Sequence, residues 1–253
     1  MTQSQAPIVL FCDFGLPYTG QMKARLCLEA PGVPVIDLFH DVPAYDIQAG
    51  SVLLAAHADD FPVGSLFLCV VDPGVGTTQR QPGVLFAGGR WFIGPFNGLF
   101  EHVVRRYGED AKADIKAFEI VADQVAVSAT FHGRDIFAPA AARLARGDQS
   151  GLKPVELKTI RKAEFQEDVR AVIYVDGFGN LMTGIRAKSL RADETIEILG
   201  HQLAMVRTFG DVEPGTLIVY ENAVGLLEIA ASQANAHDIL RISTLPSVKI
   251  VKL

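Results

Sequence analysis

The sequence predicts an α/β domain with a mostly parallel central sheet, followed by a smaller all-β, barrel-like domain. Strand and helix patterns alternate over the first 72 residues, as they do in parallel α/β sheets. The runs 8–12 and 66–71 are unbroken and apolar, which is typical of strands covered on both faces. After residue 168, short strands recur between turn signals with little helical pattern. We therefore expect an α/β domain at 1–150, a linker at 151–168 and a β domain at 169–253.

Hydrophobic spacing predicts the elements of each domain in turn. In the first domain they are strand 8–12, helix 20–30, strand 33–39, helix 46–59 with Asp46 suited to its N-cap, strand 66–71, strands 84–86 and 91–93 around Gly88-Gly89, helix 99–107 and helix 136–146. In the second domain they are strands 171–175, 195–199, 203–206, 216–220, 226–229, 239–242 and 248–251. The segment between the two sets lacks an amphipathic period and carries several lysines and glutamates, so we interpret it as the linker.

Composition indicates an ordinary globular protein and gives no support for nucleic-acid binding. Of the 253 residues, 49% are hydrophobic and 21% charged, and the net charge is −6 with lysine and arginine dispersed. The run 8–12 is too short to span a membrane, and no basic segment before it marks a signal peptide. Cys12, Cys27 and Cys69 lack metal-ligand spacing and two lie in apolar runs, so we expect reduced thiols in a cytoplasmic protein.

Asp72 ends the apolar run 66–71 and is followed at once by Pro73-Gly74-Val75-Gly76. Proline cannot continue a central ladder, and glycine permits backbone geometry that is closed to other residues. This pattern places Asp72 at the carboxyl end of a strand, where open α/β sheets bind ligands. Apolar runs before Asp13 and Asp176 also end in aspartate beside glycine. Because Asp-Gly is a common turn pair, a surface turn or ion pair is the alternative at each position.

Asp72, Arg80 and His132 form a candidate catalytic set. An arginine beside a carboxylate keeps the carboxylate ionised, and a histidine can orient or deprotonate water. His132 stands just before a predicted helix, where a structural cap or exposed side chain is the alternative. His40-Asp41 resembles a metal-binding pair, but no second such cluster accompanies it, so we expect no metal site. The sequence has no P-loop, dinucleotide fingerprint or Gly-x-Ser-x-Gly elbow.

Asp13 and Asp176 are suited to bind hydroxyl groups, such as those of a ribose, or an ammonium group. Phe178 offers an aromatic face, and the amide of Asn180 can pair with the edge of a base. The alternative is an Asp-Gly-Phe-Gly turn in which Phe178 fills the core of the β domain.

Six motifs occur in one order along nearly the whole chain. They are Asp13-Phe14-Gly15, Val71-Asp72-Pro73-Gly74-Val75-Gly76-Thr77, Gly94-Pro95-Phe96-Asn97-Gly98, Phe131-His132-Gly133-Arg134-Asp135-Ile136-Phe137, Asp176-Gly177-Phe178-Gly179-Asn180 and Gly225-Leu226-Leu227-Glu228-Ile229-Ala230. Together they resemble the S-adenosylmethionine hydroxide adenosyltransferases, the adenosine-forming S-adenosylmethionine hydrolases related to the fluorinase and chlorinase. The second and fourth motifs are specific, and the others are weaker alone.

The resemblance implies an α/β domain, a C-terminal β-barrel and a cytoplasmic homotrimer whose sites lie between one subunit's N-terminal domain and its neighbour's C-terminal domain. It implies that Asp72, Arg80 and His132 position water for in-line attack on the ribose C5′ carbon, giving adenosine and methionine without a cofactor or metal. The partner is then a small nucleoside substrate, with no nucleic acid and no membrane. The substrate-binding positions that it implies are Asp13, Tyr18, Tyr45, Phe131, Asp176, Phe178, Asn180, Ala223 and Val224.

Water is favoured over halide as the nucleophile. The fluorinase has tyrosines at the positions of Asp72 and His132, and a carboxylate beside a bare halide would repel it by several kcal/mol, an order-of-magnitude figure for a dry pocket. The chain also lacks the extra loop that the fluorinase carries after this region, since Arg80 runs almost directly into Val84.

Three departures from the family pattern leave alternatives open. The loop 15–20 is two residues shorter and lacks the usual second acidic residue, and Asn222-Ala223-Val224 replaces an Asn-Ser pair. Both changes fall where the methionine group should bind. The arginine of the triad also aligns with either Gln79 or Arg80, and we assign it to Arg80. A non-catalytic adenosine or S-adenosylmethionine binding protein, and a hydrolase of another 5′-substituted adenosine, are the alternative functions.

Overall fold

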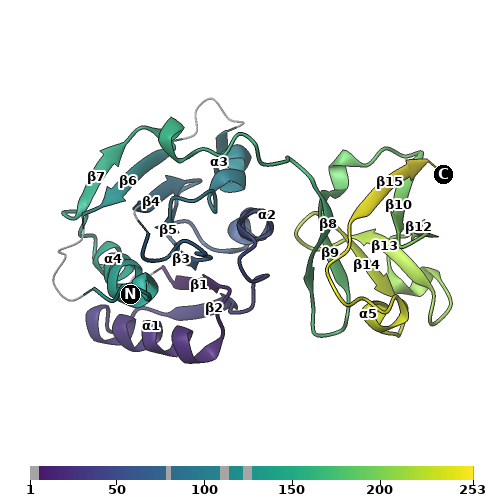
Figure 1. Ribbon diagram of the computed structural model, residues 1–253, viewed down its shortest axis with the longest axis horizontal. Helices are drawn as coiled ribbons and strands as arrows, with labels where there is room; N and C mark the ends of the chain where they lie inside the picture. The colour runs from purple at the N-terminus through teal and green to yellow at the C-terminus, as the bar shows by residue number, and fades with distance from the viewer. Residues whose placement is uncertain (1–5, 78–80, 109–113, 122–126, 253) are drawn as a thin grey trace, which may run out of the picture. The chain divides into compact units, whose positions relative to one another are not determined.

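The computed structural model describes residues 6–77, 81–108, 114–121 and 127–252, and the chain divides into two compact units, Met1–Phe165 and Gln166–Leu253 (Figure 1). In the described part of the chain, no helix combines the length and the apolar character needed to cross a bilayer. The two-part organisation agrees with the expected α/β and β regions.

A seven-stranded sheet forms the centre of the first unit. Its strand order is β2 (Val35–Phe39), β1 (Ile8–Cys12), β3 (Leu66–Val70), β5 (Arg90–Pro95), β4 (Pro82–Ala87), β6 (Lys116–Ile120) and β7 (Leu152–Val155). The first four strands in this order are parallel, and the remaining pairs are antiparallel. The expected parallel centre is therefore present, within a sheet that is mixed as a whole.

The change of direction occurs at Gly88-Gly89. Both glycines have positive φ, +56° and +73°, the conformation that two-residue hairpin turns require. This turn folds β4 against β5 as an antiparallel pair, so the sheet continues antiparallel through β6 and β7.

Two pairs of helices cover the sheet, α1 (Leu16–Glu29) with α4 (Ala138–Ala145) and α2 (Ile47–His57) with α3 (Glu101–Gly108), and Figure 1 shows the pairs on opposite faces. Side-chain alternation along β1 explains this arrangement. Leu10 belongs to the core under α1 and α4, whereas Phe11 packs edge-to-face on Phe39, which in turn contacts His57 of α2. A strand buried on both faces must be apolar throughout, as β1 is.

The helix boundaries follow local chemistry. The side chain of Asp46 accepts a hydrogen bond from the Ala49 N–H at 2.9 Å, which confirms the predicted N-cap of α2. The expected start of the first helix at residue 20 is wrong, because α1 begins at Leu16. Gly15 turns the chain at φ +73°, and Pro17 fits the first helical turn, where its missing N–H costs nothing.

The segment expected to be a linker, 151–168, is largely built into the first unit. Its β7 strand pairs with β6, and a 3₁₀ turn follows at Leu157–Ile160. The chain divides only after Phe165. Short strands at a sheet edge carry little periodic signal, so the sequence pattern did not reveal β7.

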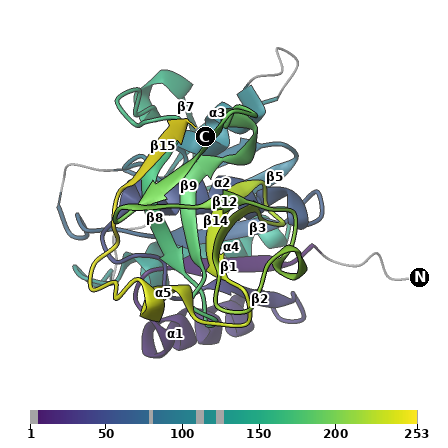
Figure 2. The same ribbon diagram turned by 90° about the vertical axis from the view of Figure 1, so that its right-hand side faces the viewer.

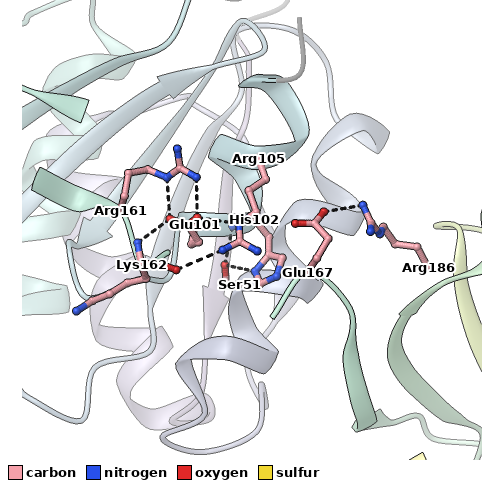
Figure 3. Close-up of polar contacts among 8 residues, drawn as sticks. All are labelled: Ser51, Glu101, His102, Arg105, Arg161, Lys162, Glu167 and Arg186. Carbon is pink, nitrogen blue, oxygen red and sulfur yellow. Dashed lines mark hydrogen bonds and ion pairs between the residues drawn. The ribbon is translucent and has the colours of Figure 1, made fainter. Parts of the chain in front are cut away.

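Glu101 of α3 fastens the end of this segment (Figure 3). The side chain of Glu101 is fully buried and accepts hydrogen bonds from Arg105, Arg161 and the Lys162 N–H at 2.7–2.9 Å. Burial alone would raise the pKa of Glu101, but these donors outweigh burial and lower it to about 2. The next residue, His102, bonds to Ser51 through Nδ1 at 2.9 Å.

The second unit consists of two sheets around one apolar core. One contains β11 (His201–Gln202), β10 (Glu194–Ile198) and β15 (Val248–Lys252), and the other contains β12 (Ala204–Met205), β13 (Leu217–Glu221), β14 (Leu226–Ala231), β9 (Leu181–Arg186) and β8 (Val169–Val175). All pairs except β12–β13 are antiparallel. Figure 2 shows β8, β9 and β14 together. Closure of the described strands into a barrel is not detected, so the expected β domain is present as two sheets.

In this unit one predicted strand is wrong and one strand was not predicted. The expected strand 239–242 is wrong, because a short helix, α5 (Ala236–Ile239), ends there. Asn235 caps it by accepting the Asp238 N–H at 2.9 Å. Strand β9 was not predicted, since Gly184 interrupts its apolar pattern. Gly184 is required because a Cβ would lie 2.5 Å from Cβ of Val169.

Candidate active site

A pocket of about 450 Å³ opens beside the carboxyl ends of β1 and β3 in the first unit. Six of the residues predicted for the site line it, namely Asp13, Tyr18, Tyr45, Asp72, Phe131 and His132. They come from four stretches that are separated in the sequence. The parallel strands bring these stretches to one edge of the sheet, as the position of Asp72 after β3 predicts.

Asp72 follows the most buried part of the sheet. Every residue of β3 is buried, and both carboxylate oxygens of Asp72 are shielded from solvent. The loop that follows turns back through a hydrogen bond from the Val75 N–H to the Asp72 carbonyl oxygen at 3.3 Å. Gly76 has φ +80°, and a Cβ there would lie 2.5 Å from the Ala129 carbonyl oxygen. The loop therefore packs against the segment that leads to His132.

His132 stands at the start of a π-helical turn, Gly133–Phe137, that runs into α4. Such turns are rare and frequently occur at functional sites. Gly133 allows a close approach to α1 and β3, since a Cβ there would lie 3.0 Å from the Met22 sulfur and 3.5 Å from Val70. This packing holds the helix start, which carries His132, against the end of β3, the strand that leads to Asp72.

Asp135 fastens the same turn to the preceding segment. Its carboxylate accepts the Ser128 N–H at 2.9 Å and two hydrogen bonds from Arg134 at 2.7 and 2.9 Å. The Arg134 guanidinium holds the pKa of the Asp135 carboxyl below its usual value. The hydrogen bond from Ser128 thus joins the backbone before His132 to the turn after it.

Asp13, which follows β1, also lines the pocket and is joined to Tyr45. The Tyr45 N–H donates to Asp13 Oδ2 at 3.0 Å, and this bond holds Tyr45 at φ +66°, an uncommon conformation for a bulky residue. Burial raises the pKa of Asp13 despite that bond. A carboxylate in such a partly buried environment makes stronger hydrogen bonds to hydroxyl groups than it would in water.

Three aromatic rings form one wall of the pocket. Phe14, Tyr18 and Phe131 contact one another edge-to-face, with ring centroids 5.5–6.0 Å apart. The guanidinium carbon of Arg134 lies 5.2 Å from the centroid of Phe131, and Arg134 also donates to Gln21 at 3.1 Å. A wall of this kind can contact a nucleoside base or a cation.

Phe14, Gln21 and Arg134 also line the pocket, although none of them was predicted for the site. Phe14 and Arg134 belong to motifs that were singled out, so their signal was present. Gln21 stands five residues into α1. It lies within the predicted helix 20–30, but none of the six motifs contains it.

Five more of the predicted site residues lie in the second unit. Asp176 accepts hydrogen bonds from the Phe178 N–H, the Asn180 N–H and Asn180 Nδ2 at 2.8–3.0 Å. This tight loop leaves Phe178 81% exposed. The alternative in which Phe178 fills the core is therefore wrong. Ala223 and Val224 occupy the turn between β13 and β14.

Arg80, like Gln79, lies outside the described residues, so its prediction stays untested. His40 and Asp41 lie at the surface with 3.5 Å between Nδ1 and Oδ1. Within the described residues, no group of three or more His, Cys, Asp or Glu side chains is placed to hold a metal ion. Cys12 and Cys69 are buried and Cys27 is exposed, and all three are free.

The fold and the pocket define an α/β protein with a ligand site at the carboxyl edge of its parallel strands, followed by a β unit. Residues 8–152 match the N-terminal domain of the SAM hydroxide adenosyltransferases, and residues 170–249 match the C-terminal domain. The chain belongs to the SAM hydroxide adenosyltransferase family.

Several relatives carry names that bear on activity. An (R)-S-adenosyl-L-methionine hydrolase of Thermus thermophilus is 36% identical over 250 residues, which cover 92% of this chain and 95% of the relative. A fluorinase of Nocardia brasiliensis is 25% identical over 281 residues, covering 92% and 93%. The crystal structure of an uncharacterized conserved protein from Thermotoga maritima has a TM-score of 0.82 at 29% identity, covering 97% of this chain and 100% of that one.

Proposed function

We propose that the protein hydrolyses S-adenosylmethionine to adenosine and methionine. The observation that carries the proposal is the placement of Asp72 and His132 in one pocket with Asp13 and an aromatic wall. Hydrolases in the family are named for the (R) epimer at sulfur, and we infer the same substrate here. Asp72 favours water over halide, since a shielded carboxylate repels an anion.

In this proposal the chemistry is a single displacement. The oxygen of water forms a bond to C5′ of the ribose, the C5′–sulfur bond breaks, and the electron pair of that bond stays on sulfur. Methionine leaves as a neutral thioether, so the leaving group needs no acid. Water loses one proton, for which His132 is the acceptor, while Asp72 and Arg80 hold the water in line. The task of these residues is alignment and activation of the nucleophile.

Substrate binding is proposed to use residues of both units. Asp13 and Asp176 would bind hydroxyl or ammonium groups, and Asn180 would bind the base edge. Tyr18, Tyr45, Phe131 and Phe178 would supply apolar contact, and Ala223 and Val224 would border the methionine end. We propose a homotrimer in which the first unit of one subunit meets the second unit of its neighbour. The exposed rings of Tyr45 and Phe178 support this, since association would cover them.

The free cysteines fit a reducing compartment, and we propose that the protein works in the cytoplasm.

The proposal is tested by incubating purified protein with each sulfur epimer of S-adenosylmethionine and following adenosine by chromatography. Adenosine should form from the (R) epimer, and Asp72→Ala or His132→Ala should reduce the rate by at least about 100-fold. Asp60→Asn and His201→Ala, which change exposed residues that do not line the pocket, are the matched controls. Tight adenosine binding without turnover would instead indicate a binding protein, and turnover only with another 5′-substituted adenosine would indicate a different hydrolase.

A further inference from the structure

Val71, the residue before Asp72, is held at a point where the sheet ladder has ended. The pairing of β3 with β1 stops at Cys12–Val70, and the pairing with β5 stops at Leu68–Ile93. Val71 itself is fully buried. Its carbonyl oxygen accepts a hydrogen bond from Asn97 Nδ2 at 2.9 Å, from a residue that follows β5. A side-chain amide thus continues the ladder by one residue.

Asn97 is itself held in place from both sides. Its Oδ1 accepts the Leu99 N–H at 3.1 Å, so the donor and the acceptor of the amide are both used. The end of β5, which leads into the loop that carries Asn97, is pressed onto the end of β3, since a Cβ on Gly94 would lie 2.2 Å from the Cys69 carbonyl oxygen. The side chains of Val71 and Leu99 also pack on α2, since a Cβ on Gly50 would lie 3.4 Å from Val71 Cγ2 and 3.1 Å from Leu99 Cδ1.

We propose that Asn97 is a positioning residue that sets the direction of the Asp72 carboxylate. The inference rests on the proposed function, in which Asp72 holds the attacking water. The Val71 carbonyl belongs to the peptide that joins Val71 to Asp72, so rotation of this peptide changes φ of Asp72 and tilts its Cα–Cβ bond, and with it the side chain. The Asn97 bond stops that rotation. Because reacting groups must be aligned to well under an ångström, a loosened peptide costs rate rather than affinity.

Asn97→Asp is the most selective change. Aspartate has the same shape and keeps the acceptor for the Leu99 N–H, but it places a carboxylate oxygen against the Val71 carbonyl oxygen in place of the donor. We expect kcat to fall about 10- to 100-fold, with KM for S-adenosylmethionine and the affinity for adenosine changed less than about threefold. Gln149→Glu, an amide-to-acid change at an exposed site of the same unit, is the control and should leave both unchanged. If the aspartate variant does not fold, Asn97→Ala is measured in the same way, and we expect the same fall in kcat with KM changed less than about threefold.

A double-mutant cycle separates positioning from general damage. If Asn97 acts through Asp72, Asn97→Asp should slow the residual reaction of Asp72→Asn less than about twofold, measured at high enzyme concentration. An equal loss in both backgrounds, or a rise in KM with kcat unchanged, would overturn the positioning role. Normal activity of Asn97→Asp beside an inactive Asp72→Asn would overturn this inference alone. Full activity of Asp72→Asn would overturn the proposed function as well.

Discussion

Replacing Glu101 by glutamine should make the first unit less stable at neutral pH and remove part of its acid sensitivity. The carboxylate is fully buried and is surrounded by donors from Arg105, Arg161 and the Lys162 backbone. Glutamine keeps the size of the side chain but offers one acceptor oxygen without charge. Both arginines therefore lose a charged partner.

The pKa shift gives the size of the effect. The pKa of Glu101 falls from 4.5 to about 2 on folding, and each tenfold change in proton affinity is worth about 1.4 kcal/mol. The ionised carboxylate thus stabilises the fold by about 3 kcal/mol. A value of about 2 kcal/mol is more realistic for the variant, because the Arg161 side chain is 38% exposed and regains water. Since the folded pKa is the lower one, the stabilisation is complete above about pH 5 and is lost as pH falls toward 2.

Urea unfolding at several pH values measures this difference. The free energy of unfolding of Glu101→Gln should lie about 2 kcal/mol below that of the parent at pH 7, and less than half of this gap should remain at about pH 3. Glu164→Gln is the control, because Glu164 is 69% exposed and lies 3.8 Å from Lys162 Nζ, and it should change stability by less than about 0.5 kcal/mol. A gap that is absent at pH 7, or equally large at both pH values, would refute the role given to Glu101.

Three further changes test the pocket and its surroundings. Gly76→Ala should destabilise the protein by about 1–3 kcal/mol and slow the reaction, because its φ of +80° and the Ala129 carbonyl oxygen leave no room for a Cβ; unchanged thermal unfolding would contradict this. Phe178→Ala should change stability by less than about 0.5 kcal/mol, since the ring is exposed, yet raise KM severalfold; an unchanged KM would remove Phe178 from the site. Asp13→Ala should weaken adenosine binding about 10-fold, as expected for the loss of a hydrogen-bonded carboxylate, and calorimetry that shows equal affinity would exclude that contact.

Local rules predicted the elements on which the pocket depends. An unbroken apolar run followed by Asp-Pro-Gly placed Asp72 at a strand end, and the structure has it there. Asp46 caps the next helix as its side-chain chemistry requires. His132 and Asp13 line the same pocket, and they do so because parallel strands end at one edge of the sheet. The correct fold class was therefore sufficient to predict that they lie in one site.

The features that the sequence did not predict depend on long-range contacts or on turn geometry. The bond from Asn97 to the Val71 carbonyl joins residues 26 positions apart, and no periodic pattern marks it. Phe178 is exposed because the Asp176 side chain takes up the backbone N–H groups of its loop, which apolar character alone does not show. The apolar residues near 239–242 suited a strand as well as a helix, and only the Asn235 cap distinguishes them.

The route of the oxygen atom tests the proposed reaction most directly. When the protein acts on S-adenosylmethionine in water enriched in heavy oxygen, the 5′-hydroxyl of adenosine should carry one heavy oxygen and methionine should carry none, as mass spectrometry can determine. The Asp72→Ala variant should give no labelled adenosine above the uncatalysed background. Unlabelled adenosine would contradict attack of an Asp72-held water on C5′. Heavy oxygen in the amino acid product, formed together with a thioether whose C5′–sulfur bond is intact, would contradict it as well.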